Sequence, residues 1–171
     1  LSLTTLPIAS ASLEDAGTIQ ILPGKVVSWF TLDDSRVGVL YDNGNFEVDD
    51  FSSGIHSMNF EITGMGDTNV AKADPSNSLI GIGTEEGIYV INLATMSIIE
   101  NITTEFPVSA LAWDIDGDLW IGMVGGGRNA LEYRAGVATG QSTQPHSIGI
   151  TDITVLPDGK IATSGNDEVI I

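Results

Sequence analysis

The sequence contains no cysteine and few basic residues. Among its 171 residues, 6 are Lys or Arg and 23 are Asp or Glu, so the formal net charge is −17. The absence of cysteine excludes a disulfide framework, a thiolate zinc site and a cysteine nucleophile. The lack of clustered Lys and Arg argues against nucleic acid and against anionic membrane surfaces as partners, because both attract positive charge.

Long hydrophobic runs are absent as well. No apolar stretch approaches the roughly 20 residues that a helix needs to span a bilayer. Hydrophobic residues nevertheless make up 42% of the chain, and they are spread along it. A chain of this size buries roughly two-thirds of its unfolded surface, so the composition predicts a folded domain with its own core.

What the sequence does contain is an internal repeat. A small residue between aliphatic neighbours recurs at Gly38, Gly81, Gly122 and Ala162, at successive spacings of 43, 41 and 40 residues. A missing or short side chain at this position would let a neighbouring sheet approach closely. A period near ~40 residues with several strands in each unit is typical of a β-propeller blade.

Turn signals keep the same register as the small residues. Asp116-Gly117 and Asp158-Gly159 precede two of them, and Asp42-Asn43-Gly44 follows another. Gly and Asn accept positive φ, so such sequences between apolar runs predict tight hairpin turns. Each repeat therefore reads as strand, turn, strand, turn and strand, with a further outer strand after it.

We therefore expect an all-β fold, a β-propeller built of four-stranded antiparallel blades, with about four blade equivalents in one domain over residues 1–171. The repeats are expected near residues 26–62, 69–103, 108–142 and 150–171, with residues 18–22 as a candidate closing strand. A helix is the alternative over residues 93–102, where apolar spacing fits in part. The β-rich run 98–103 favours the strand.

One repeat carries a recognisable motif. Residues 108–133 contain Asp-Gly-Asp-Leu-Trp-Ile-Gly followed by a glycine-rich turn, and this segment resembles the repeat of two-component-regulator propellers. Residues 88–95 resemble the third strand and following turn of WD-repeat propellers, and residues 157–165 are similar to a propeller inner hairpin. Trp113-Asp114 ends a first strand, however, whereas the WD-repeat signature ends a third, and no Gly-His pair precedes the repeats. The resemblance thus implies the fold and no functional residue.

The run Asp114-Ile115-Asp116-Gly117-Asp118 resembles a calcium loop. The usual loop has Gly at its sixth position and Glu at its twelfth, whereas here Gly is fourth and the twelfth position is Gly125. A plain strand turn is the favoured interpretation, and calcium is the alternative. No other cofactor and no histidine metal site is predicted, because His56 and His146 have no partner at ligand spacing.

No catalytic residue is predicted, since the sequence lacks a Gly-x-Ser-x-Gly elbow. In a propeller, the loops between second and third strands and those between blades open on one face. Arg128, His146, Asp67 and Asn69 would share that face and are the predicted ligand-binding residues. The Gly125–Arg128 run is either a phosphate cradle or a flexible blade loop, and the absence of a following helix favours the loop.

The predicted function is a non-catalytic propeller platform that binds a protein or another ligand on its loop face. The alternative is a propeller-type hydrolase or lyase with acidic residues in the central funnel as acid and base. The acidity itself indicates either a strongly solvated surface or a docking face for a basic partner.

Assembly and location leave alternatives open. The apolar run Val169–Ile171 would form an exposed edge, so we expect a homodimer that completes a larger propeller. A piece of a longer propeller and a closed four-bladed monomer are the alternatives. Ala9-Ser10-Ala11 resembles a signal-peptidase site, although an ordinary β-rich start is the favoured interpretation of residues 1–13 because no basic segment precedes the apolar stretch. Asn101-Ile102-Thr103 is a glycosylation sequon, and a secreted or extracellular location is expected slightly ahead of a cytoplasmic one.

Overall fold

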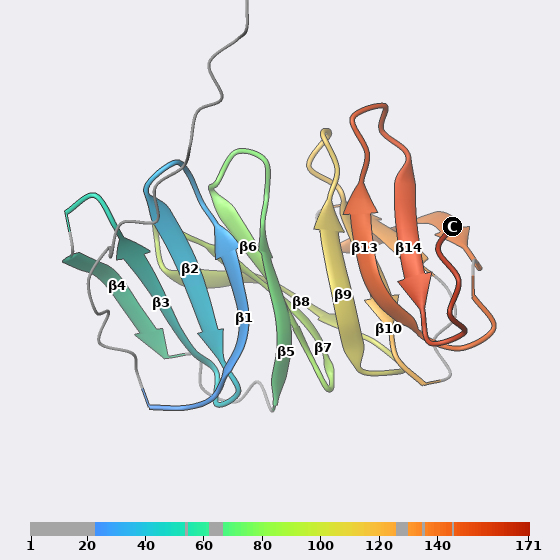
Figure 1. The fold of residues 1–171 in the computed structure, drawn as a ribbon, viewed down its shortest axis with the longest axis horizontal. Coiled ribbons are helices and arrows are strands. Elements are labelled where there is room, and N and C mark those ends of the chain that lie inside the picture. Colours follow the sequence, from blue (N-terminus) through green and yellow to red (C-terminus); the bar gives the residue numbers. More distant parts are fainter. Residues whose placement is uncertain (1–22, 54, 62–66, 126–129, 135, 145) are drawn as a thin grey trace, which may run out of the picture.

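The structure is a computed structural model, and it describes residues 23–53, 55–61, 67–125, 130–134, 136–144 and 146–171. The described chain consists of strands and turns, and none of it forms a helix that is long and apolar enough to cross a membrane (Figure 1). The strands are β1 (Val26–Thr31), β2 (Arg36–Tyr41), β3 (Asn45–Asp50), β4 (Ile55–Glu61), β5 (Thr68–Ala73), β6 (Leu79–Thr84), β7 (Gly87–Asn92), β8 (Ser97–Thr103), β9 (Val108–Trp113), β10 (Leu119–Met123), β11 (Ala130–Arg134), β12 (Val137–Thr143), β13 (Ile150–Val155) and β14 (Ile161–Gly165).

These strands form four antiparallel sheets in chain order. Sheet 1 is β1–β4, sheet 2 is β5–β8, sheet 3 is β9–β12, and sheet 4 contains β13 and β14. The all-β, antiparallel prediction is confirmed, and the strand at 97–103 was the correct choice over a helix. The proposed closing strand at residues 18–22 lies outside the described residues.

The sheets follow one another in a row, with their first strands adjacent. β1 packs beside β5, β5 beside β9, and β9 beside β13 (Figure 1). Sheets 1 and 4 stand at opposite ends of the row, and no strand pairing joins them within the described residues. Residues 169–171 return along β14, where Ile170 bridges Ser164, and Ile171 and Thr163 exchange backbone hydrogen bonds of 2.9 and 3.0 Å.

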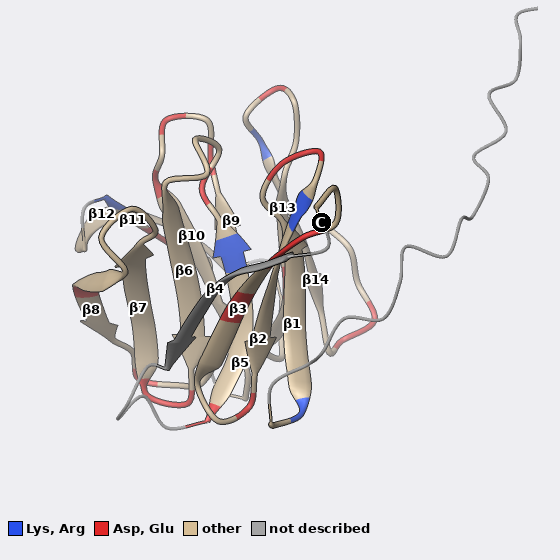
Figure 2. Ribbon diagram, turned by 90° about the vertical axis from the view of Figure 1, so that its left-hand side faces the viewer, with Lys and Arg blue, Asp and Glu red and all other residues tan. Residues whose placement is uncertain are grey.

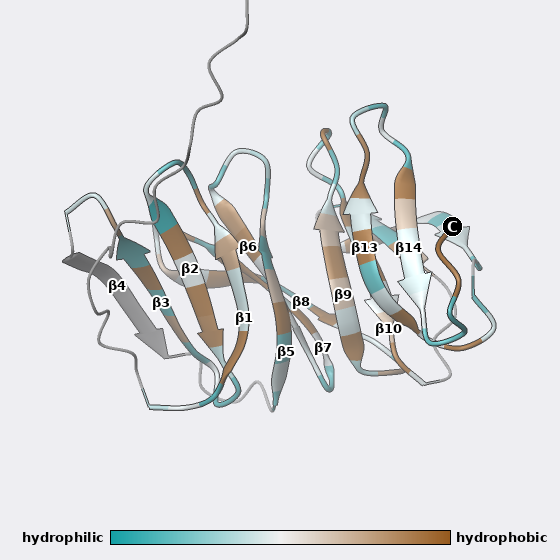
Figure 3. Cartoon of the chain, in the orientation of Figure 1, coloured by the Kyte–Doolittle hydropathy of each residue, from teal (hydrophilic) through white to brown (hydrophobic). Residues whose placement is uncertain are grey.

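Many strands carry apolar residues (Figure 3), and their side chains form a hydrophobic layer between each pair of successive sheets. The layer between sheets 1 and 2 contains the stacked rings of Phe30 and Phe46, whose centroids are 6.0 Å apart. The layer between sheets 2 and 3 is built around Val90, Leu111 and Ile121. The layer between sheets 3 and 4 is smaller, and it contains mainly alanines together with Ile150 and Ile153.

Each first strand has a register shift near its start, which sequence reasoning missed. One extra residue stands there, and these residues are Val27, Asn69, Ser109 and Thr151. A bulge of this kind bends the strand and re-aims a side chain. At two of the four positions the side chain then reaches the next sheet: Asn69 Nδ2 donates to the Val108 carbonyl at 3.2 Å, and Ser109 Oγ donates to the Ile150 carbonyl.

The small residues of the repeat lie on the second strands, but the close approach differs among them. A Cβ on Gly122 would stand 2.7 Å from Ile150 Cγ2 of the next sheet. Gly122 pairs with the residue directly after the bulge of its first strand, as Gly83 does in sheet 2, so the predicted alignment of Gly122 with Gly81 was wrong by two residues. A Cβ on Gly81 would meet sheet 3 at ordinary distances of 3.4 Å or more, because the tight contact in sheet 2 is two residues later, between Gly83 and Val108 at 2.6 Å. Gly38 is covered instead by the Phe30 ring of its own sheet, at 2.5 Å.

This difference predicts that a Gly→Ala substitution changes the free energy of unfolding by different amounts at Gly122 and at Gly81. Gly122→Ala should destabilise the fold by about 1–3 kcal/mol, because Ile150 must move to admit the new methyl group. Gly81→Ala should be neutral or stabilising by up to about 1 kcal/mol, because its methyl group fits and the unfolded chain loses freedom. Urea unfolding of both variants measures this, and equal costs would contradict the sheet packing described here.

Candidate functional site

The predicted site residue His146 is buried, with its side chain 0% exposed. It links the loop before β13 to strand β14 and to the turn that follows β14. Its Nδ1 lies 2.8 Å from Asp167 Oδ1, and its Nε2 lies 3.0 Å from Thr163 Oγ1. Asp167 also accepts the Ser147 backbone N–H, and this bond is the main reason why its pKa is lowered to about 2. The order Asp-His-Thr resembles a catalytic relay, but the His146 and Thr163 side chains are buried, and their hydrogen bond holds the loop before β13 against β14.

Asp67 and Asn69 are engaged in contacts near the start of sheet 2. The Asp67 carbonyl accepts the Glu85 backbone N–H at 3.1 Å, and Asn69 Nδ2 donates to Glu85 Oε1 at 3.2 Å. No hydrogen bond or ion pair of the described chain joins either residue to His146. Arg128 lies outside the described residues, so a shared ligand face for these four residues stays a prediction.

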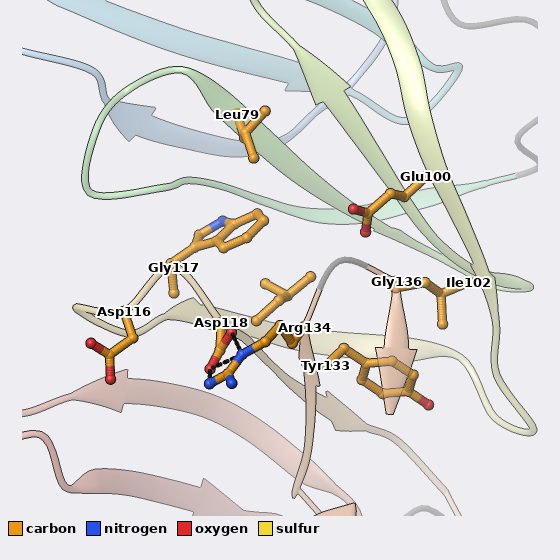
Figure 4. Close-up of a pocket in the computed structure, with 11 residues that line it drawn as sticks. Leu79, Glu100, Ile102, Asp116, Gly117, Asp118, Tyr133, Arg134 and Gly136 are labelled. Atoms are coloured by element: carbon orange, nitrogen blue, oxygen red, sulfur yellow. Dashed lines mark hydrogen bonds and ion pairs between the residues drawn. The ribbon is translucent and has the colours of Figure 1, made fainter. Parts of the chain in front are cut away.

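A cavity of about 260 Å³ opens elsewhere, between sheets 2 and 3 at the end where the β9–β10 turn lies (Figure 4). We call it the inter-sheet groove. Its lining residues come from β6, β8, β9, β10 and β11 and from two turns: Leu79, Glu100, Ile102, Trp113, Asp116, Gly117, Asp118, Leu119, Tyr133, Arg134 and Gly136. Sequence reasoning missed the groove because its residues belong to two repeats.

Aromatic and aliphatic side chains form much of the groove wall. Trp113 is half-buried, and its indole Nε1 donates to the Lys72 carbonyl of sheet 2 at 3.0 Å, which fixes the ring between the two sheets. Tyr133 is also half-buried, and Leu119 is fully buried. The groove thus offers rigid apolar surface beside polar groups, which is the usual make-up of a ligand site.

One carboxylate of the groove is already neutralised. Arg134 donates to both oxygens of Asp118, with its Nε 2.8 Å from Oδ1 and 3.1 Å from Oδ2. The guanidinium hydrogen bonds are the main reason why the pKa of Asp118 is lowered. The Asp118 side chain is 4% exposed and that of Arg134 is 68% exposed, so the pair closes one side of the groove with its cation facing solvent.

A second carboxylate, Glu100, has no such partner. No hydrogen bond or ion pair reaches it from the described residues, and burial raises its pKa. The position of a Cβ on Gly136, whose φ is +73°, lies only 3.2 Å from Glu100 Oε2. Gly136 in the β11–β12 turn therefore leaves room for the Glu100 carboxylate to enter the groove from sheet 2 (Figure 4).

Asp114, Asp118 and Glu132 bring one carboxylate oxygen each to within 4.8 Å of one another. The expected calcium loop contained Asp116 rather than Glu132, so the sequence located only part of this cluster. Asp114 Oδ1 accepts the backbone N–H groups of Asp116 and Asp118, at 3.0 and 2.9 Å, as in a strand turn. These bonds and the Arg134 pair account for Asp114 and Asp118 without an ion, and the calcium alternative stays a prediction.

A related cavity of about 340 Å³ lies between sheets 1 and 2. Its lining differs in chemistry, because it contains no aromatic ring and no carboxylate. Its one charged residue, Arg36, is paired with Asp33 at 2.7 Å. The repeat therefore creates a gap between neighbouring sheets twice, and the gap between sheets 2 and 3 is the one with aromatic and acidic residues.

Neither protein-family models nor curated proteins match this sequence at a significant level.

The buried histidine network predicts a stability effect. Thr163→Val should destabilise the fold by about 1–3 kcal/mol, because His146 Nε2 loses its only described partner in a buried place. Thr154→Val, which changes an exposed threonine of the same sheet, is the matched control and should change stability little. Urea unfolding measures both, and a Thr163→Val variant as stable as the control would contradict a structural role for His146.

The Asp118–Arg134 pair predicts a pH dependence. Because the folded-state pKa of Asp118 lies below its unfolded value of about 4, its stabilisation is present above that pH and is lost as the pH falls through the folded-state pKa. Asp118→Asn should therefore lower stability at neutral pH, and the difference from the wild type should shrink below about pH 4. Urea unfolding across this range measures the difference, and a constant gap would show that the charge of Asp118 contributes nothing.

Proposed function

We propose that this chain is a propeller-type, non-catalytic platform that binds a ligand in the inter-sheet groove between sheets 2 and 3. The observation that carries the proposal is the groove itself. It combines fixed aromatic and aliphatic walls with Glu100, a carboxylate without a partner among the described residues. A partly buried charge without a partner weakens a fold, and its presence is explained if a ligand supplies the missing partner.

The free face of sheet 1 supports the propeller part of the proposal. Trp29 is 68% exposed there, and its strand neighbour Val39 is only half-buried. In the strand register, Val39 corresponds to Ile82 of sheet 2 and Ile121 of sheet 3. Both of these isoleucines are fully buried in the hydrophobic layer against the preceding sheet. In a ring every sheet has a neighbour on both faces, and such a neighbour would cover Trp29.

A hydrolase or lyase is the second candidate, and one observation favours it. The groove holds Glu100 with a raised pKa and Asp118 with a lowered pKa, and such a difference between neighbouring carboxyl groups is how acid and base roles are divided. The bidentate Arg134 pair ties Asp118 in place, however, which leaves it poorly suited to attack or to accept a proton. We therefore favour the binding platform.

Filling the groove tests the proposal. A thermal-shift screen with sugars, metal ions and short peptides should yield a ligand that stabilises the fold by mass action. Leu79→Trp, which adds bulk in the groove, should remove that shift, whereas Ala94→Phe in the cavity between sheets 1 and 2 is the matched control and should retain it. A ligand that still stabilises the Leu79→Trp variant would place the site elsewhere, and turnover of a bound compound would favour the enzyme.

A further inference from the structure

The groove has an excess of negative charge, and this bears on the class of ligand. Its lining contains three carboxylates, Glu100, Asp116 and Asp118, and one cation, Arg134. The cation is bound to Asp118 and is also attracted by the nearby Asp116, so Glu100 is the lining carboxylate for which no cation is found among these residues. The three carboxylates outnumber the single cation, so the lining repels an anionic ligand and attracts a cationic one.

The shape and surface of the groove narrow the class further. Leu79, Ile102 and Leu119 supply aliphatic surface, and Trp113 and Tyr133 supply aromatic rings. A side chain with an apolar stem and a charged head matches such a lining, because the stem covers aliphatic surface while the head reaches polar groups. Aromatic rings add attraction for a cation that lies over their faces.

The chain as a whole is also acidic. Figure 2 shows Asp and Glu concentrated in the turns at the ends of the strands, with few Lys and Arg between them. With a formal charge of −17 over the whole chain, the surface attracts a basic partner before any contact forms and raises its rate of association. Among basic side chains, the guanidinium of arginine can pair with a carboxylate through two parallel hydrogen bonds, which the ammonium of lysine cannot do.

Resting on the proposed binding function, we propose that the inter-sheet groove takes an arginine side chain from a basic segment of a partner protein. The stem lies along Leu119 and Trp113, and the guanidinium pairs with Glu100 while Asp116 attracts it at the rim. Burial raises the pKa of Glu100 in the free protein, and the positive charge of the bound arginine offsets this effect by favouring the ionised carboxylate.

A matched pair of peptides tests the proposal. The probes are the capped pentapeptides acetyl-Gly-Ser-Arg-Ser-Gly-amide and its citrulline counterpart, which has nearly the same shape and no charge. In a nitrogen–proton NMR titration at low salt, the arginine peptide should shift the indole N–H signal of Trp113, while the signals of Trp29 and Trp120 report on surfaces outside the groove. The citrulline peptide should leave all three unchanged, and high salt should weaken the arginine binding.

Two variants locate the contact. Glu100→Gln should lower the affinity for the arginine peptide by about tenfold, through loss of the charge-assisted pair, and should raise the melting temperature of the free protein. Glu86→Gln removes the same charge from the exposed β6–β7 turn and should change neither the affinity nor the melting temperature. Equal binding of the two peptides, or arginine binding unaffected by Glu100→Gln, would overturn the proposal.

The same titration separates two questions: whether the ligand is cationic, and whether the groove binds any ligand. If the arginine peptide leaves the Trp113 signal unchanged while a neutral sugar shifts it, the inference of a cationic ligand is wrong and the groove remains a binding site. If neither the peptides nor the sugar panel shifts that signal, both the inference and the proposed use of the groove are wrong.

Discussion

The packing of each sheet on the face of the next is the constraint on which the rest of the structure depends. No sheet of four short strands has a core of its own, so each buries its apolar residues against a neighbour. A glycine removes a side chain at two of these contacts, at Gly122 under Ile150 and at Gly83 under Val108. Bulges at Asn69 and Ser109 then add hydrogen bonds from one first strand to the next.

The same packing creates the candidate site. Successive sheets lie close along their first strands and leave space near the turns that join the first and second strands, where two cavities open. The apolar lining residues, such as Leu119 and Leu93, belong to the core, whereas the charged residues Glu100, Asp116 and Arg36 do not, so the polar chemistry of the two cavities can differ between repeats. Between sheets 1 and 2 the charged residue is the paired Arg36, whereas between sheets 2 and 3 three carboxylates, one arginine and two aromatic rings line the space.

Much of the fold could be predicted from the sequence because hairpin turns and strand alternation are local signals. The repeat spacing of Gly38, Gly81, Gly122 and Ala162 located the second strands. The inter-sheet groove could not be predicted, because Glu100 and Arg134 belong to different repeats and only the stacking of sheets brings them together. The tight contact at Gly83 was missed for the same reason, since no local pattern separates it from Gly81. His146 was predicted to bind a ligand; the structure shows its side chain buried and hydrogen-bonded to Asp167 and Thr163, and the binding role stays a prediction.

The stacking of successive sheets is measured most directly by proton–proton distances across the gaps. In a methyl-labelled sample, the stacked arrangement predicts strong nuclear Overhauser effects between the Gly122 Hα protons and the Ile150 γ2-methyl group, and between the Gly83 Hα protons and a Val108 methyl group. Both pairs join different sheets, so neither effect arises from strand pairing. Their absence in a folded sample, with the pairing within each sheet intact, would contradict the account.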